Sequence, residues 1–283
     1  MDKIIALVDG SIYSESVCDH AAWIAGRTGA PIEVLHVLGR REAPETSDLS
    51  GSIRLGARTQ LLEELAELDA QRAKLVSQRG RAILEDARAI FDRIGLSDVT
   101  TRLRRGDAVE AISEVEDEAR VIVIGKRGEA ADFAKGHLGS NLERIVRAVH
   151  RPVFVASRAF APIDRVLVAH DGGSSAIKAV EHISQSPLFK GLAVTVVSVG
   201  PETPAARRWL DDATGKLNAA GLDASSRTVD GRPEEVLGEM VVKDGFGLLV
   251  MGAYGHSRIR SLVIGSTTTE MLRSCKVPVL LMR

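Results

Sequence analysis

The sequence predicts an α/β protein built from two doubly wound domains, each with a five-stranded parallel sheet of order 3-2-1-4-5. Three observations support this fold class. The chain repeats its own pattern, short apolar runs alternate with helix-length segments, and 283 residues are enough for two ordinary domains. Runs of Val, Ile and Leu that are apolar on both faces suit buried parallel strands, and their alternation with helices implies right-handed crossovers.

The strands are expected in two sets of five. In the first half they cover residues 3–8, 32–38, 99–104, 121–125 and 152–156, and in the second half residues 165–170, 193–199, 224–229, 248–252 and 278–282. We expect one domain over residues 1–158 and another over residues 163–283, with Pro162 at the seam. The halves differ by one addition to the first, the segment 53–94.

The added segment has the three- and four-residue spacing of apolar side chains that is typical of an amphipathic helix. Its apolar residues are Leu61, Leu62, Leu65, Leu68, Ile83, Leu84, Ala87, Ile90, Phe91 and Ile94, and Gly80 marks a potential break or kink. Two interpretations remain open. The segment is either a lengthened helix or helical hairpin packed on the sheet, which we favour, or a coiled-coil or partner-binding arm.

Composition excludes several classes of protein. The formal net charge of -1 gives no electrostatic reason to expect nucleic acid or an anionic membrane as partner. No apolar run approaches the ~20 residues needed to cross a bilayer, and residues 4–8 are too few for the core of a signal peptide. Cys18 and Cys275 fall in different domains, so we expect no disulfide framework and a cytoplasmic location.

The strongest local motif follows the fourth strand of the second half. Gly252 and Gly255 allow a sharp turn and close approach of a ligand, and Gly265 precedes a helix that begins with Ser266 and Thr267. Free N–H groups and the positive end of the helix dipole favour an anion at such a helix start. The motif therefore predicts a cradle for a chain of phosphates, although it is neither a P-loop nor a dinucleotide fingerprint.

The first half carries a poorer version of this motif. Its loop has Gly125 and Gly128, then Gly139, Ser140 and Asn141, with one residue too many before Gly139, and Asp9 ends the first strand. Lys126 and Arg127 either bind phosphate or are solvated loop charges, and we favour the second interpretation. This half is expected to be a weaker nucleotide site or a structural partner.

The spacing G-x2-G-x9-G-S after the fourth strand resembles the nucleotide motif of the universal stress protein family. The opening strand that ends in Asp-Gly and the closing Pro-Val strand resemble that family in both halves. The resemblance implies an adenine nucleotide alpha hydrolase-like fold, in which ATP or another adenine nucleotide lies near the carboxyl ends of the strands. Mg²⁺ would sit on the phosphates and not in a protein cage.

The same resemblance implies a set of ligand contacts in the second half. Adenine would lie between Ala169, His170 and Asp171 on one side and Ser198 and Val199 on the other, with Asp171 on the base or ribose. The ribose and phosphates would be held by Met251, Gly252, Gly255, Gly265, Ser266 and Thr267. It also implies that the two short closing strands pair, which makes an internal pseudo-dimer, with further homodimers an option.

Local structure offers another explanation for the same residues. Asp171 is also suited to cap a helix or shape a turn, and Thr267 with Glu270, like Ser140 with Glu143, fits a capping box.

No catalytic motif or paired-cysteine zinc spacing is present, so fast hydrolysis is not predicted. We predict an ATP-binding stress-response protein that acts by nucleotide-dependent contacts with unknown protein partners. The alternatives are a slow ATPase or autophosphorylating enzyme, and a nucleotide-free interaction scaffold.

Overall fold

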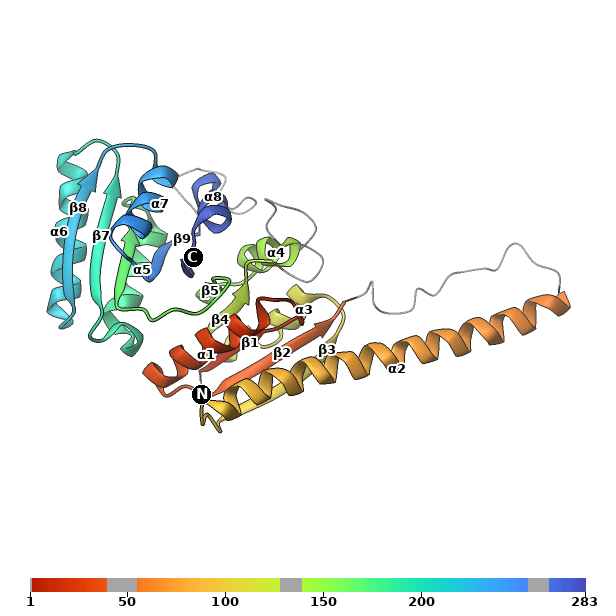
Figure 1. Cartoon of the computed structure of the whole chain (residues 1–283). Helices are drawn as coiled ribbons and strands as arrows, with labels where there is room; N and C mark the ends of the chain where they lie inside the picture. Colours follow the sequence, from red (N-terminus) through yellow and green to blue (C-terminus); the bar gives the residue numbers. More distant parts are fainter. Residues whose placement is uncertain (1, 40–54, 128–138, 254–264) are drawn as a thin grey trace.

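The computed structural model describes residues 2–39, 55–127, 139–253 and 265–283, and its ten strands form one sheet (Figure 1). The strands of the first half are β1 (Lys3–Leu7), β2 (Ile32–Leu38), β3 (Val99–Arg105), β4 (Ala119–Gly125) and β5 (Val153–Ala156). Those of the second half are β6 (Arg165–Ala169), β7 (Ala193–Val199), β8 (Asp223–Val229), β9 (Leu248–Gly252) and β10 (Val279–Met282). Each strand lies where the sequence predicts it, to within one or two residues at either end.

The strand order confirms the predicted topology in both halves. It runs β3-β2-β1-β4-β5-β10-β9-β6-β7-β8, so each half has the order 3-2-1-4-5 counted along its own chain. Neighbouring strands within a half are parallel, and the two halves join through antiparallel β5 and β10, where Leu280 opposes Phe154. All residues of both joining strands are buried, so the expected pairing of these apolar edges is present.

Helices cover both faces of the sheet. One face carries α1 (Ser14–Thr28), the end of α2 (Leu55–Arg93), α5 (Ser174–Gln185) and α6 (Pro204–Ala219). The other carries α3 (Ala108–Ser113), α4 (Ser140–Ala148), α7 (Pro233–Lys243) and α8 (Ser266–Ser274). The short 3-10 helix η1 (Glu116–Glu118) lies with α3, and η3 (Pro187–Phe189) lies with α1 and α5. Each face has one hydrophobic core that continues from the first half into the second.

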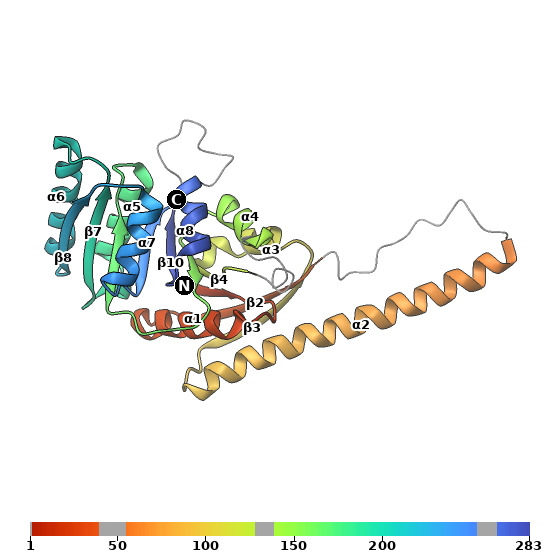
Figure 2. The ribbon, with the colours of Figure 1, turned by 45° about the horizontal axis from the view of Figure 1, so that its top comes forward.

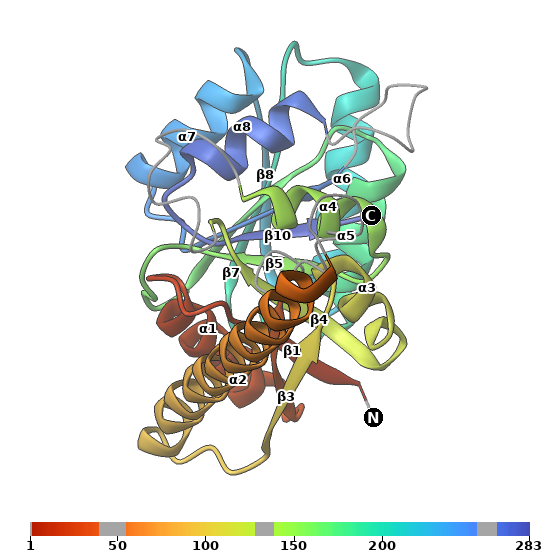
Figure 3. The same cartoon turned by 90° about the vertical axis from the view of Figure 1, so that its right-hand side faces the viewer.

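The added segment forms α2, a single helix of 39 residues and not a hairpin. Its carboxyl-terminal part buries Leu84, Ala87 and Phe91 in the core, while its amino-terminal part extends away from the rest of the protein (Figures 1 and 2). Figure 3 views the protein from the side of the amino-terminal end of α2, with α1 beside this helix. Gly80 is no break, because it lies inside α2 where a Cβ atom would come within 2.9 Å of the side chains of Leu38 and Leu103.

Candidate functional site

The carboxyl ends of β6, β7 and β9 meet at one edge of the second-half sheet. β6 lies between β7 and β9 and is parallel to both, with Ala169 beside Val197 and Val168 beside Val250. The chain therefore leaves β6 toward one side and returns to its other side as β9, and ligands of open α/β sheets bind where the strand order reverses in this way. The predicted contacts Ala169, His170, Asp171, Ser198, Val199, Met251 and Gly252 all follow or end these three strands.

The turn after β6 is held by its own side chains. His170 is buried, and its Nδ1 accepts a hydrogen bond from the N–H of Gly172 at 3.1 Å. The Asp171 carboxylate accepts one from the N–H of Gly173 at 2.8 Å. Asp171 thus shapes the turn, as the structural alternative predicted, but it does not cap α5, whose N-cap is Gly173 without a side-chain hydrogen bond. Burial lowers the pKa of His170, against the opposing effect of Asp171.

Trp209 of α6 is a residue of this site that the sequence did not reveal. Gly172 has a φ of +79°, and a Cβ atom there would lie 2.6 Å from the Trp209 ring. The indole therefore rests on the turn that follows β6, beside Asp171. The one signal in the sequence is that Trp209 lies in the helix that follows β7. The first half has a similar contact, because Ile83 of α2 packs on Gly10 in the turn after β1.

The start of α8 faces the end of β9. Its N-cap is Gly265, with no side-chain hydrogen bond to the cap, so the predicted capping box of Thr267 and Glu270 is not formed. The first helical bond joins the N–H of Thr269 to the carbonyl of Gly265 at 2.9 Å. The backbone N–H groups of Ser266 and Thr267 precede it, in the part of the helix where such groups have no intrahelical acceptor.

Two hydrogen bonds fix α8 against the end of β9. The N–H of Gly265 donates to the carbonyl of Ala253 at 3.5 Å, and the buried hydroxyl of Thr268 donates to the carbonyl of Gly252 at 3.2 Å. Thr268 was not among the predicted contacts, although it continues the run of hydroxyl residues that opens the helix. Gly255 falls in the range 254–264, outside the described residues.

The corresponding place in the first half is partly filled. Gly125 ends β4, and a Cβ atom there would lie 2.7 Å from the Tyr13 side chain, so the tyrosine packs directly on it. Asp9 accepts a hydrogen bond from the N–H of Ser11 at 3.0 Å. Gly139 is the N-cap of α4, so Ser140 is not at the N-cap position that a capping box with Glu143 requires. Gly128 falls in the range 128–138, outside the described residues, and Asn141 lies in the first turn of α4.

Lys126 corrects the interpretation that we favoured from sequence. Its side chain is not a solvated loop charge but is buried, and its ammonium group donates to the carbonyl of Cys275, which is the C-cap of α8 in the other half. The carbonyl of Val277 lies 3.5 Å away. Burial lowers the pKa of Lys126. Lys126 therefore links the two halves through its side chain.

Membranes and metal ions are two further kinds of partner that the described residues can be searched for. None of their helices is both long and apolar enough to cross a bilayer. Within the same ranges, no group of three or more His, Cys, Asp or Glu side chains is placed to hold a metal ion.

Comparison with known proteins identifies relatives over the whole chain. The model of the Universal stress protein family matches residues 1–157 and again residues 162–283. The universal stress protein Slr1230 of Synechocystis is 37% identical over 287 residues, covering 100% of both chains. The universal stress protein Rv1996 of Mycobacterium tuberculosis is 26% identical over 310 residues, covering 99% of this chain and 94% of the relative.

The fold has a counterpart among solved structures. The crystal structure of a universal stress protein from Archaeoglobus fulgidus superposes with a TM-score of 0.74, covering 99% of this chain and 98% of the other. The two sequences are 20% identical, so this likeness concerns the fold alone.

Proposed function

This chain belongs to the universal stress protein family as a tandem of two such domains, and from this premise we propose that its second half binds an adenine nucleotide, ATP in the first instance. The observation that supports the proposal is the start of α8 beside the end of β9, where the N-cap Gly265 has no side chain to occupy the first N–H groups. Its backbone N–H groups and the helix dipole favour the phosphates, and Ser266 and Thr267 add hydroxyl groups. Gly255 and Met251 would complete the contacts to ribose and phosphate.

The adenine and ribose would lie between the ends of β6 and β7. Ala169, His170 and Asp171, at the end of β6, would form one wall of this place, and Ser198 and Val199, at the end of β7, would form the other. Trp209 adds an aromatic face beside Asp171 on which a base can stack. Mg²⁺ would bind to the phosphates, where it neutralises their charge. In the first half, Tyr13 on Gly125 and the inward turn of Lys126 favour a structural role over a second strong site.

The test is a calorimetric titration of the full chain with ATP, ADP and adenosine. If N–H groups at the start of α8 bind the phosphates, affinity increases from adenosine to ADP to ATP. Ser266→Asp places a carboxylate where a phosphate would lie and should weaken ATP binding at least tenfold, about 1.4 kcal/mol. Ser266→Ala keeps the backbone donors and should bind ATP nearly as well as the unaltered protein.

Two results would overturn the proposal: equal affinity for adenosine and ATP, or unchanged ATP binding by Ser266→Asp. These two outcomes concern binding alone.

We propose that the protein acts in the cytoplasm by nucleotide-dependent contacts with partners and not by turnover. An assay for released phosphate that detected hydrolysis at enzymatic rates would favour the ATPase alternative instead.

The extended part of α2 supports a second function, self-association. Leu61, Leu68 and Leu75 follow at intervals of seven and are 37%, 60% and 65% exposed, and Leu65 lies between the first two. This is the spacing of a coiled-coil seam. The helix would be roughly 58 Å long, far longer than its packing on the sheet requires. The amphipathic pattern therefore accounts for packing at one end of the helix, and we propose that it provides the coiled-coil arm at the other.

Charge along the arm favours a second copy of this chain as the occupant of the seam. Residues 61–70 carry the acidic Glu63, Glu64, Glu67 and Asp69 without a basic residue, and residues 71–81 carry the basic Arg72, Lys74, Arg79 and Arg81 without an acidic one. Two arms that pair antiparallel would place each acidic part against the basic part of the other. A parallel pair would place like charges together.

Light scattering on the full chain tests this arm. We expect a dimer that Leu68→Glu converts to a monomer, because the substitution puts a charge in the seam. Glu63→Gln, on the same part of the helix but outside the leucine spacing, should remain a dimer. A monomer for the unaltered chain at high concentration would contradict self-association through α2.

A further inference from the structure

The amino ends of the strands carry a cluster of charges in the first half, on the face covered by α3 and α4. Glu33 of β2 is buried between two cations: its carboxylate lies 3.3 Å from Lys3 Nζ and 2.7 Å from Arg102 Nε. Lys3 also contacts Glu118 at 2.6 Å. A carboxylate thus fills the space between the first and third strands and neutralises the cations on either side.

Strand register identifies the same positions in the second half. In the first half Glu33 lies beside Ile5 and Thr100, with Lys3 two residues before Ile5 and Arg102 two residues after Thr100. In the second half Thr195 lies beside Leu167 and Ser225, with Arg165 two residues before Leu167 and Arg227 two residues after Ser225. Thr195 therefore occupies the position of Glu33, while both flanking cations are kept, as Arg165 and Arg227.

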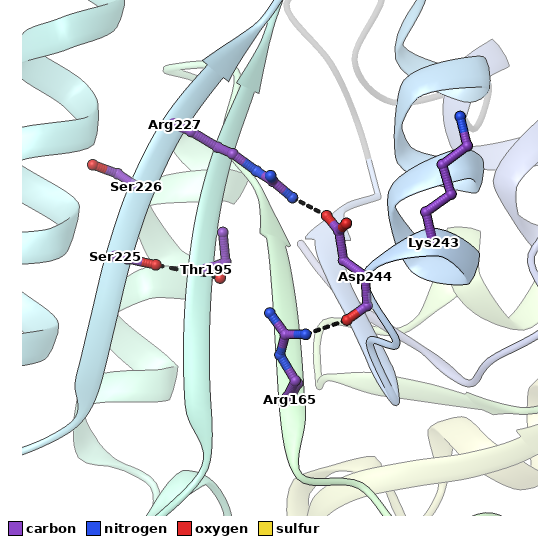
Figure 4. Close-up of a pocket in the computed structure, with 7 residues that line it drawn as sticks. All are labelled: Arg165, Thr195, Ser225, Ser226, Arg227, Lys243 and Asp244. Carbon is purple, nitrogen blue, oxygen red and sulfur yellow. Dashed lines mark hydrogen bonds and ion pairs between the residues drawn. The ribbon is translucent and has the colours of Figure 1, made fainter.

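A cavity lies at this place in the second half. It measures about 490 Å³ and is lined by Arg165, Thr195, Ser225, Ser226, Arg227, Lys243 and Asp244 (Figure 4). Arg165 and Arg227 both point toward Asp244, and the hydroxyl groups of Thr195 and Ser225 lie 3.3 Å apart on the floor. Ser226 is on the other side of β8 from Arg227 (Figure 4).

In the first half both cations of the cluster contact a carboxylate, whereas around this cavity one of the two corresponding arginines does not. The Asp244 carboxylate pairs with Arg227, whereas Arg165 donates to the backbone carbonyl of Asp244, which has no net charge. Lys243 at the rim pairs with Glu239 at 2.6 Å. Among the described residues that line the cavity, Asp244 is the single carboxylate, against Arg165, Arg227 and Lys243.

We propose that this cavity binds a small oxyanion, the carboxylate or phosphate group of a small metabolite, in the place that the Glu33 side chain occupies in the first half. The guanidinium groups of Arg165 and Arg227 present planar sets of donors that match such groups, and Thr195 and Ser225 supply hydroxyl donors. The cavity lies at the amino ends of the strands, whereas the start of α8 lies at their carboxyl ends. It is therefore a site separate from the proposed nucleotide site.

The experiment measures the midpoint of thermal unfolding of the full chain and calorimetric binding, with inorganic phosphate and with citrate, against chloride at equal ionic strength. Thr195→Glu recreates the first-half arrangement and should weaken binding of either oxyanion at least tenfold, while it raises the unfolding midpoint when no oxyanion is added. The matched control Thr101→Glu makes the same change of residue at an exposed position of β3, in the other half of the chain, and should leave binding unchanged. Stronger binding of phosphate would identify a phosphoester as the ligand class, and stronger binding of citrate an organic acid.

A second variant tests the same proposal independently, in case Thr195→Glu folds poorly. Arg227→Gln removes one guanidinium from an exposed position and should also weaken binding of the preferred oxyanion at least tenfold. Ser266→Asp, which targets the nucleotide site, should leave oxyanion binding intact, so the two proposals can fail separately. The inference is overturned if chloride has the same effect as phosphate and citrate, or if neither Thr195→Glu nor Arg227→Gln weakens binding.

Discussion

His20 of α1 packs against β5 and against the segment that connects the two halves, and its surroundings make it sensitive to pH. Its ring is fully buried, with ring centroids 5.3 Å from Phe154 and 5.1 Å from Phe160. Nδ1 donates to the carbonyl of Ser16 at 2.6 Å, and the Ser16 hydroxyl donates to the carbonyl of Ser157. Burial lowers the pKa of His20 to about 4, although the hydrogen bond to Ser16 opposes the shift.

We therefore expect the folded state to lose stability in acid through His20. A histidine held neutral contributes fully above its unfolded pKa of about 6.5 and loses that contribution as the pH falls from there toward 4. Between pH 7 and pH 5 the loss should be about 2 kcal/mol in the free energy of unfolding. Urea unfolding at both values checks this, and His20→Gln should show a smaller difference. An equal loss in the variant would assign the effect to other groups.

At the scale of elements, the strands could be predicted from sequence and the contacts between halves could not. Each strand is a local run of apolar residues, so its position is read from a few neighbouring residues. Lys126 binds a carbonyl 149 residues away, and nothing near it in the sequence indicates that partner. For the same reason Tyr13 on Gly125 and Trp209 on Gly172 appear only when the helices are folded onto the turns. The glycines of the candidate site were predictable because turns require them locally.

Lys126 shows how one element of the first half supports an element of the second. A cation at the carboxyl end of α8 satisfies backbone carbonyls and complements the helix dipole. Lys126→Met should lower the free energy of unfolding by about 1–3 kcal/mol, because it leaves a buried carbonyl without its donor. Chemical unfolding measures this, with the neighbouring Arg127→Met as control. Equal small effects of both substitutions would show that the buried bond contributes little.

The whole molecule depends on one continuous sheet. β5 and β10 are central strands of that sheet and edge strands of their own halves, so the pairing covers two apolar edges at once. Further contacts cross the same boundary: Arg283 donates to the carbonyls of Arg147, Ala148 and Val149 at the end of α4, and Arg27 donates to Leu188. The tandem chain is thus a pseudo-dimer within one polypeptide.

This arrangement predicts a severe effect of charge at the junction. Val153→Lys would bury an ammonium group opposite Leu281 in the core, and should lower the free energy of unfolding by at least about 3 kcal/mol and expand the molecule. Thr101→Lys, on exposed β3 at the far edge of the sheet, should change it little. Chemical unfolding and small-angle scattering check both variants. Unchanged stability and compactness of Val153→Lys would contradict the pairing.

The account of function depends on backbone donors at the start of α8, and amide NMR during an ATP titration tests them most directly. The full chain should show its largest shift changes at the N–H groups of Gly265, Ser266 and Thr267, with smaller changes at the matching Gly139, Ser140 and Asn141. Amides of residues 265–267 that stay unchanged at millimolar ATP, or that move less than those of residues 139–141, would contradict it.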